Sequence, residues 1–494
     1  MQQSANALGE LMGQKEQWIA AIGRRSGPRY IAIVEALSEM IESGVIEGGY
    51  QLPTQRYLAK MLGLAPGTTA RAYMIAAQRG LISGETGRGT FVRREASVML
   101  LPRDARYVED NLEPTGPAIG LGEGPPLGDL AMPNVDAGNL NDEIRRALLG
   151  AASDLDFALG RYHPHGAQVP LRFREAGSRW LAQLGFAAPP DDVVLTNGAH
   201  GALYLILFSE NLRRLPVMTS ALTYSGLRNM AIAHRRPLVP LEVDEHGPVP
   251  DSVEQAYKHA GGRILFLQTQ VHNPTCVSMP LQRRKELVEL SRKYDLIVIE
   301  DNAAALVLLD TVPPVAALAP ERTFLISSCA KSISPALSVG IVSVPQGWAS
   351  QLNVAIRTHH IYASMVNVEV LNAMMADRSV ERIWAQSRAK VTARIDMARR
   401  ALGPFRIEAR PDSWFAWLDL PDGWNSESFT TMARMQGIAV GGSANFTVDG
   451  MAPDRNGVRL SLTGPGSDAA ARDYLRKLRE LLDRGAQEGE RIYA

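Results

Sequence analysis

Apolar positions recur at helical spacing through the N-terminal part of the chain. Between residues 30 and 43 they return every three or four positions, until a glycine ends the run. A second, shorter run follows Thr54, a good N-cap, and a third covers residues 68–80. Two β-rich runs, 81–83 and 90–92, then flank a glycine-rich turn. The order of helix, helix, tight turn, helix and hairpin predicts a winged helix-turn-helix.

Further along the chain, short apolar runs alternate with helical patterns. The apolar runs cover residues 191–198, 216–220, 235–243, 262–270, 295–302, 322–328 and 337–344. Strands that alternate with helices over about 250 residues predict an α/β body, a parallel sheet with helices on both faces. Because ligands of such sheets bind at the carboxyl ends of the strands, we expect the site at that edge.

The segment between these two regions, residues 95–126, contains scattered proline and glycine and no sustained period. It predicts a linker, with room for one short docked helix. The expected organisation is therefore an N-terminal domain of residues 24–94, this linker, and a body of residues 127–494.

The composition supports a soluble protein of more than one domain. The chain has 494 residues, of which 46% are hydrophobic and 21% charged. No apolar run approaches the roughly 20 residues that span a bilayer, and the first residues do not form a signal-peptide pattern. We therefore expect a cytoplasmic protein without a membrane partner. Two cysteines, Cys276 and Cys329, cannot form a disulfide framework or a four-thiolate zinc site, and no metal is expected.

The charge is balanced overall but not along the chain. Lys plus Arg and Asp plus Glu both number 52, which excludes a uniformly basic nucleic-acid coat. Residues 24–94, however, hold ten cations against five anions, so this domain is near +5 and the remainder near −5. The asymmetry favours a polyanion partner for the N-terminal domain, with a merely solvated face as the alternative.

A winged helix-turn-helix places its third helix in the major groove of double-stranded DNA. The outward positions of the predicted third helix put Thr68, Thr69 and Arg71 near base edges or phosphates. Arg88, at the tip of the wing, would meet the DNA backbone, and Arg56 on the second helix is a further DNA-binding candidate.

The stretches QLPTQRYLAKMLGLAPGTTARAY and GLISGETGRGTFV resemble GntR-type DNA-binding domains over about 65 residues. The sequence departs from that family at the entrance to the recognition helix, where many members carry Ser-Arg and this chain has Ala65 and Pro66. The departure affects which bases are read. The alternative is a three-helix domain that mediates only protein contacts.

Small and polar residues follow the predicted strands of the body. Gly198, Ala199 and His200 begin a helix directly after a strand, an arrangement that forms an anion site. The other strand-end candidates are Asn273, Asp301, Ser328 and Lys331. Each is weak alone, since a single Asp after a strand is usually a turn or cap residue. An amide, a carboxylate and a lysine at neighbouring strand ends together indicate a site.

Their order resembles fold type I pyridoxal phosphate enzymes of the aminotransferase class, from Leu130 onward. The resemblance implies that Lys331 forms a Schiff base with the cofactor aldehyde and that Asp301 pairs with the pyridine nitrogen. It also implies that Asn273 donates a hydrogen bond to the ring phenolate and that Tyr224 stacks on the ring.

The same resemblance assigns the remaining site residues. The phosphate would be held by the amides of residues 198–200, by Ser328 and by Tyr162 reaching across from a second subunit, which implies a homodimer. Arg459 matches the arginine that clamps a substrate carboxylate through two parallel hydrogen bonds.

Two positions depart from the aminotransferase pattern. Ala304 stands where a tyrosine would bond the phenolate, and Ser338 stands where an arginine would bind phosphate. Each lost charge-assisted bond costs roughly 1.5 to 3 kcal/mol, unless a residue such as His200 or Arg228 compensates. A retained fold without cofactor is therefore an alternative.

The two halves together resemble the MocR family of bacterial transcription regulators. That resemblance implies a regulator that binds DNA sequence-specifically and senses an amino compound through pyridoxal phosphate in its body. Two alternatives stay open: an active aminotransferase with a DNA-binding head, and a cofactor-free regulator that uses the old cavity for another ligand.

Overall fold

The computed structural model divides into two compact units, residues 1–106 and 107–494. It describes residues 18–23, 29–42, 45–78, 81–85, 89–92, 128–131, 140–152, 169–305, 312–448 and 455–485. The predicted linker, residues 95–126, lies outside these ranges, as do Arg88 and Tyr162. Within the described part of the chain, no helix combines the length and the apolar character that a membrane span requires.

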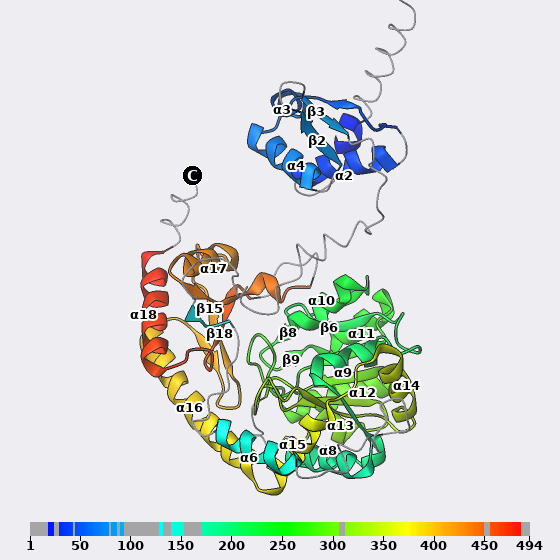
Figure 1. Cartoon of the computed structure of the whole chain (residues 1–494), viewed down its shortest axis with the longest axis vertical. Helices are drawn as coiled ribbons and strands as arrows, with labels where there is room; N and C mark the ends of the chain where they lie inside the picture. The colour runs from blue at the N-terminus through cyan, green and yellow to red at the C-terminus, as the bar shows by residue number, and fades with distance from the viewer. Residues whose placement is uncertain are drawn as a thin grey trace, which may run out of the picture. The chain divides into compact units, whose positions relative to one another are not determined.

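The described residues of the first unit include α2, α3 and α4, a helical segment at residues 18–23 and a small antiparallel sheet, as expected for a winged helix-turn-helix (Figure 1). The elements are α2 (Arg29–Glu42), β1 (Gln51–Leu52), α3 (Gln55–Leu62), α4 (Pro66–Gln78), β2 (Ile82–Glu85) and β3 (Gly89–Val92). Thr54 caps α3, since its Oγ1 accepts a hydrogen bond from the Tyr57 amide at 3.3 Å. Strand β1, which the sequence pattern did not predict, pairs with β3 beside the predicted hairpin.

The sequence pattern places Ala70, Tyr73, Met74 and Ala77 on the inward face of α4, and the observed buried face differs from it by one position. The stripe that enters the core consists of Thr69, Ala72, Tyr73 and Ala76, while Ala77 is exposed. The prediction that Thr69 points outward was therefore wrong. Its hydroxyl is fully buried and donates to the Gln55 carbonyl at 2.9 Å, which satisfies the polar group and ties α4 to α3.

The second unit is built on a seven-stranded sheet in the order β5-β13-β12-β11-β10-β6-β7. Its strands are β5 (Val193–Asn197), β6 (Val217–Ser220), β7 (Leu238–Leu241), β10 (Ile264–Leu267), β11 (Ile297–Asp301), β12 (Thr323–Ser328) and β13 (Val339–Ser343). Each lies within one of the predicted apolar runs. A separate short hairpin joins β8 (Val243–Asp244) to β9 (Gly247–Pro248).

The sheet is mixed, whereas the sequence pattern predicted a parallel one. Strand β13 runs antiparallel to both β12 and β5, and the other neighbouring pairs are parallel. The reason is the connection after β12, residues 329–338, which contains no helix. A parallel return requires a crossover of about a dozen residues or more, usually helical, whereas an antiparallel return needs only a short loop.

Helices cover both faces of this sheet, as predicted. They are α6 (Leu140–Ala152), α8 (Leu171–Gln183), α9 (Gly198–Leu207), α10 (Ser225–Ala233), α11 (Pro250–Ala260), α12 (Leu281–Lys293), α13 (Val315–Leu318), α14 (Ala349–His359) and α15 (Met365–Ala376). Successive residues of one strand point to opposite faces of the sheet and pack against the helices on each face. On β12, Phe324 packs with α9 and α14, while Leu325 packs with α8 and α15.

A smaller sheet and three helices form a second core within this unit, which we call the small subdomain. Its elements are α16 (Ser379–Leu402), β14 (Ile407–Ala409), β15 (Phe415–Asp419), α17 (Ser426–Met435), β16 (Ile438–Ala439), β17 (Gly441–Gly442), β18 (Gly457–Ser461) and α18 (Asp468–Arg484). Strands β14, β15, β18 and β17 pair in that order, and β4 (Gly128–Asp129) pairs with β16. The long helix α16 connects the small subdomain to the region of α6 and α15 (Figure 1).

Candidate functional site

The carboxyl ends of the strands bring most of the predicted site residues together. Asp301 is the last residue of β11, and Lys331 follows β12. Burial, and then the negative charge of Asp301, raises the pKa of Tyr224 above its usual range. Burial, and then the positive charge of Arg459, lowers the pKa of Lys331 to about 8. Residues from four distant segments thus share one electrostatic environment.

Asp301 is a buried carboxylate that faces this site. Burial raises the pKa of Asp301 to about 6. The Ala303 amide donates a hydrogen bond to Oδ1 at 3.0 Å, which acts in the opposite direction and lowers the pKa. Within the described residues, the side chain of Asp301 has no cationic partner. A group that carries a positive charge or an N–H donor would stabilise the ionised carboxylate here.

Arg459 and Asn273 are joined by a hydrogen bond within the same site. Arg459 donates to Asn273 Oδ1 at 2.8 Å and to the Ala131 carbonyl at 3.0 Å. The backbone amide of Asn273 donates to Gln268 Oε1 at 3.1 Å, and its peptide bond to Pro274 is cis. Because Oδ1 accepts from the arginine, the amide nitrogen of Asn273 remains as a donor.

Trp414 is a site residue that the sequence analysis missed. Its ring lies 5.6 Å from Lys331 Nζ and 4.8 Å from the guanidinium carbon of Arg459, measured to the ring centroid. Its indole nitrogen is buried and has no hydrogen-bond partner among the described residues. A tryptophan in an apolar run is usually a core residue, so no local signal in the sequence marks Trp414 as a site residue.

The predicted anion end of the site lies at the start of α9. Gly198 has a φ of 67°, and a Cβ atom there would lie 2.8 Å from Ser338 Oγ. A residue with a side chain would therefore be strained and crowded at this position. His200 Nδ1 lies 3.4 Å from the Tyr224 hydroxyl, and Ser328 Oγ accepts from the Ala330 amide at 3.1 Å. Ala199 is half-buried on the first turn of α9.

The two departures from the aminotransferase pattern have visible surroundings. Ala304 is 7% exposed and packs into the core of the small subdomain, beside residues such as Leu130 and Trp414. Ser338 is half-buried, with a φ of 26°. Arg228, considered as a substitute for the lost arginine, is buried and donates to the Thr447 carbonyl at 2.8 Å.

In the first unit the DNA-binding candidates differ in how far their side chains are exposed. Arg56 is exposed on α3, and Thr68 is half-buried on the first turn of α4. Arg71 belongs to α4, but its side chain lies outside the described residues.

Both cysteines are buried free thiols, and no group of metal-ligating side chains occurs in the described ranges.

Comparisons with known proteins match both units. Residues 165–477 match the family described as aminotransferase class I and II, and residues 29–92 match the gntR family of bacterial regulatory proteins. The chain is 26% identical to the uncharacterized HTH-type transcriptional regulator YdeF of Bacillus subtilis, over 94% of this chain and 97% of that one.

The chain is also similar to a characterised regulator and to a solved aminotransferase structure. The vitamin B6 salvage pathway transcriptional repressor PtsJ of Salmonella typhimurium is 25% identical, over 87% of this chain and 93% of that one. The α-aminoadipate aminotransferase LysN of Thermus thermophilus, solved with N-(5'-phosphopyridoxyl)-L-leucine, superimposes with a TM-score of 0.63 at 22% identity, over 72% of this chain and 92% of that one.

The fold and the matches define a protein with a fold type I aminotransferase body and a GntR-type helix-turn-helix head. The chain belongs to the aminotransferase class I and II family, and its head makes it a transcription regulator of the MocR type.

Proposed function

We propose that this regulator binds double-stranded DNA sequence-specifically through its head and senses an amino compound through pyridoxal phosphate held in its body. One observation carries the proposal. Asp301, Asn273, Tyr224, Lys331 and Arg459 surround one site, on a chain that also carries a GntR-type head.

The buried donor set fits the cofactor. When bound, pyridoxal phosphate supplies an aldehyde that condenses reversibly with primary amines. Asp301, buried without a cationic partner among the described residues, would hold the proton on the pyridine nitrogen. The amide nitrogen of Asn273 would donate to the phenolate, while Tyr224 covers the ring.

Lys331 and Arg459 would make the site respond to an amino compound that binds there. With a pKa of about 8, Lys331 has an appreciable neutral fraction at neutral pH, which a nucleophilic amine requires. Arg459 would bind an effector carboxylate through its guanidinium. An effector amine that replaces Lys331 would change the charges beside Arg459, and that differential binding would shift the regulator between conformations.

The phosphate would lie at the start of α9, against the amides of Gly198, Ala199 and His200, with Ser328 and a second subunit's Tyr162 completing its shell. On the DNA side we assign Arg56, Thr68, Arg71 and Arg88 as contacts. A DNA-binding regulator of this kind acts in the cytoplasm.

The test is the absorbance spectrum of the full chain with added pyridoxal phosphate, before and after borohydride and dialysis. We expect a cofactor band that borohydride fixes, and its loss in Lys331→Ala. Lys285→Ala, an exposed lysine on α12, is the matched control and should keep the band. A primary amine effector should then change operator affinity in the control but not in Lys331→Ala.

Other outcomes would point to the alternatives. A colourless protein with intact operator binding would favour a cofactor-free regulator. Steady turnover of an amino donor with a keto acid would make the body an enzyme, a result that the substitutions at Ala304 and Ser338 argue against.

A further inference from the structure

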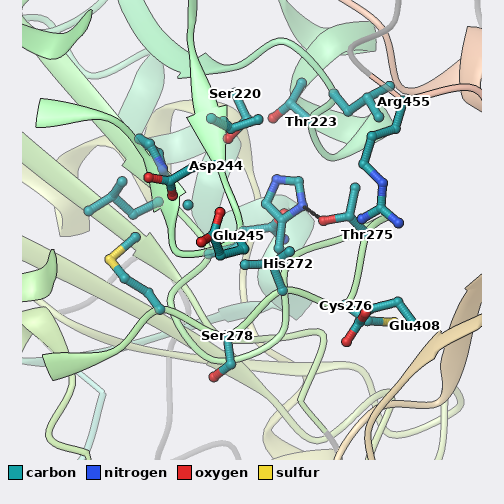
Figure 2. A pocket seen from close by; sticks show the side chains of 18 of the residues that line it. Ser220, Thr223, Asp244, Glu245, His272, Thr275, Cys276, Ser278, Glu408 and Arg455 are labelled. Carbon is teal, nitrogen blue, oxygen red and sulfur yellow. Dashed lines mark hydrogen bonds between the residues drawn. The ribbon is translucent and has the colours of Figure 1, made fainter. Parts of the chain in front are cut away.

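A cavity of about 540 Å³ lies beside the Lys331 site and is separate from it. Figure 2 shows its lining, which comes from the end of β6, the β8–β9 hairpin, the loop of residues 272–279 and the small subdomain. None of Lys331, Asp301, Tyr224 and Arg459 lines it. The volume is in the range of small-molecule sites, which measure roughly 300–1,000 Å³.

The loop that forms one wall is held in place from several sides. The Met279 amide donates to the Thr269 carbonyl at 2.8 Å, and the His272 amide donates to the Val277 carbonyl at 2.9 Å. The buried Arg284 donates to the Thr269 and Met279 carbonyls at 3.0 and 2.9 Å. The wall is therefore preformed, so a ligand would lose little binding energy to ordering it.

The interior of the cavity combines apolar surface with a neutral polar pair. Leu222, Val277 and Met279 supply apolar lining. His272 Nδ1 lies 2.7 Å from Thr275 Oγ1, and burial lowers the pKa of His272 to about 4. The imidazole is therefore uncharged at neutral pH and does not repel a cation.

The arginines of the lining already have carboxylate partners. Arg455 binds Asp419 through contacts of 2.7 and 2.8 Å, Arg406 lies 3.5 Å from the same carboxylate, and Arg410 binds Asp412 at 3.0 Å. The aspartate at the hairpin is likewise engaged, since Asp244 accepts from Arg283 at 2.8 Å. These pairs leave little positive charge available to an anion.

Glu245 and Glu408 are the lining carboxylates that differ from this pattern. In the described part of the chain neither has an ion pair or a side-chain hydrogen bond. Glu245 is exposed at the hairpin, and Glu408 is half-buried on β14. Their unbalanced charge favours a cationic ligand.

We propose that this cavity is a second small-molecule site, which takes a small organic ammonium compound. Its ammonium group binds Glu408, with Glu245 contributing from the rim, and its carbon skeleton lies against Leu222 and Val277. The proposal does not depend on cofactor binding, because no cavity residue belongs to the Lys331 site.

The probe that tests it is N,N-dimethylethanolamine, titrated calorimetrically into the full chain. As a protonated tertiary amine it cannot form an imine, so it cannot act through an aldehyde at Lys331. We expect saturable binding in the millimolar range. The neutral compound of the same shape, 3-methyl-1-butanol, should bind at least about tenfold more weakly, because it lacks the charge that Glu408 recognises.

Variants separate the cavity from general surface charge. Glu408→Gln should weaken binding of the amine by about tenfold or more, and adding Glu245→Gln should weaken it further. Glu427→Gln, which removes the same charge from an exposed position on α17, should leave it unchanged. A melting temperature like that of the wild type would show that Glu408→Gln is folded. The proposal fails if the amine shows no saturable binding, if the alcohol binds equally well, or if Glu408→Gln and Glu427→Gln behave alike.

Discussion

At the scale of single residues, Asp301 shows how a functional site weakens the fold that carries it. Its carboxyl has a pKa of about 6 in the folded chain, against 3.8 for the unperturbed group. Between these values the folded state binds more protons than the unfolded state, so stability falls as pH rises. The shift in pKa corresponds to a loss of roughly 3 kcal/mol in the free energy of unfolding. This loss is absent below about pH 4 and reaches its full size above about pH 6.

Replacing this carboxylate should therefore stabilise the cofactor-free protein. Asp301→Asn keeps the shape and removes the charge, so we expect a higher melting temperature at pH 7 and little difference near pH 4. Thermal unfolding across that pH range measures it. An equal effect of the substitution at both pH values would show that burial of the charge is not the cause. The same variant should bind pyridoxal phosphate less tightly.

Thr69 and its neighbour Thr68 allow stability to be separated from DNA recognition. Thr69→Val removes the part-buried hydrogen bond to the Gln55 carbonyl, which should cost about 0.5–1.5 kcal/mol of stability. Thr68→Val should leave stability nearly unchanged but weaken operator binding. Urea unfolding and a DNA-binding titration on both variants check this. The reverse result would restore Thr69 as a contact residue.

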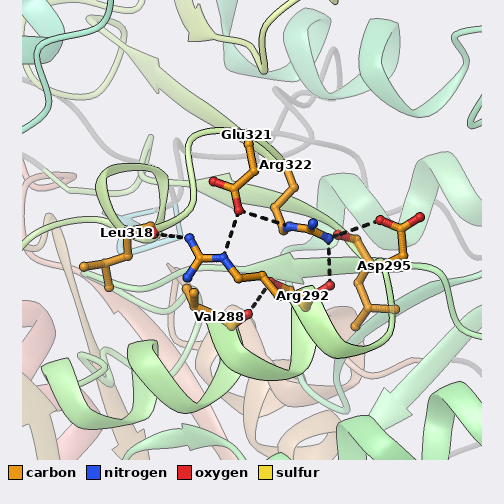
Figure 3. Close-up of polar contacts among 8 residues, drawn as sticks. Val288, Arg292, Asp295, Leu318, Glu321 and Arg322 are labelled. Atoms are coloured by element: carbon orange, nitrogen blue, oxygen red, sulfur yellow. Dashed lines mark hydrogen bonds and ion pairs between the residues drawn. The ribbon is translucent and has the colours of Figure 1, made fainter.

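At the scale of elements, Arg322 joins the end of α12 to the start of β12 (Figure 3). It donates to the Ser291 carbonyl at 2.8 Å and contacts the exposed Asp295 at 3.3 Å. Glu321 lies between Arg292 and Arg322, with contacts of 2.9 and 3.3 Å. Arg322 is only 17% exposed, whereas Arg292 and Glu321 are 49% and 47% exposed.

The two kinds of contact should differ in energy. Glu321→Gln breaks surface ion pairs and should change the free energy of unfolding by less than about 1 kcal/mol. Arg322→Ala leaves the Ser291 carbonyl without its arginine donor and should cost about 1–3 kcal/mol. Urea unfolding at low and high salt distinguishes them, because only the Glu321 effect should fade with added salt.

The sequence pattern predicted the elements better than their pairing. All seven strands of the large sheet and the three helices of the head were expected, because hydrophobic period and capping residues are local signals. The direction of β13 and the existence of the small subdomain depend on contacts distant in sequence, which period alone does not encode. The one-position error on α4 arose because Thr69 is a polar residue satisfied inside the core.

The site was predicted in part for the same reason. Strand ends identified Asp301, Asn273 and Lys331, since a parallel sheet aligns those ends at one edge. Trp414 and the cavity around His272 arise from the approach of the small subdomain to the sheet, and nothing local marks them.

At the scale of the whole molecule, several exposed apolar side chains favour a homodimer. Leu148 and Leu149 on α6 are 42% and 65% exposed, Leu171 on α8 is 52% exposed, and Val366 on α15 is 46% exposed. Helices α6 and α8 both pack on α15, so these residues share one region. Exposed apolar surface of this kind typically marks an interface.

A charge placed in this region should disrupt the dimer. In a twofold dimer each substitution occurs twice, so Leu149→Glu should convert a dimer to a monomer at micromolar concentration, measured by sedimentation velocity. Val354→Glu, at an equally apolar and exposed position on α14, should remain dimeric. A wild-type chain that sediments as a monomer would overturn the expectation.

The loop of residues 272–279 contributes to both the cavity and the proposed cofactor site. His272 and Thr275 line the cavity, while Asn273 between them holds Arg459 beside Lys331. Any compound that repositions this loop from one side alters affinity on the other, and thermodynamics requires the factor to be equal in both directions. A promoter controlled by such a protein would respond to two metabolites jointly rather than to the level of one.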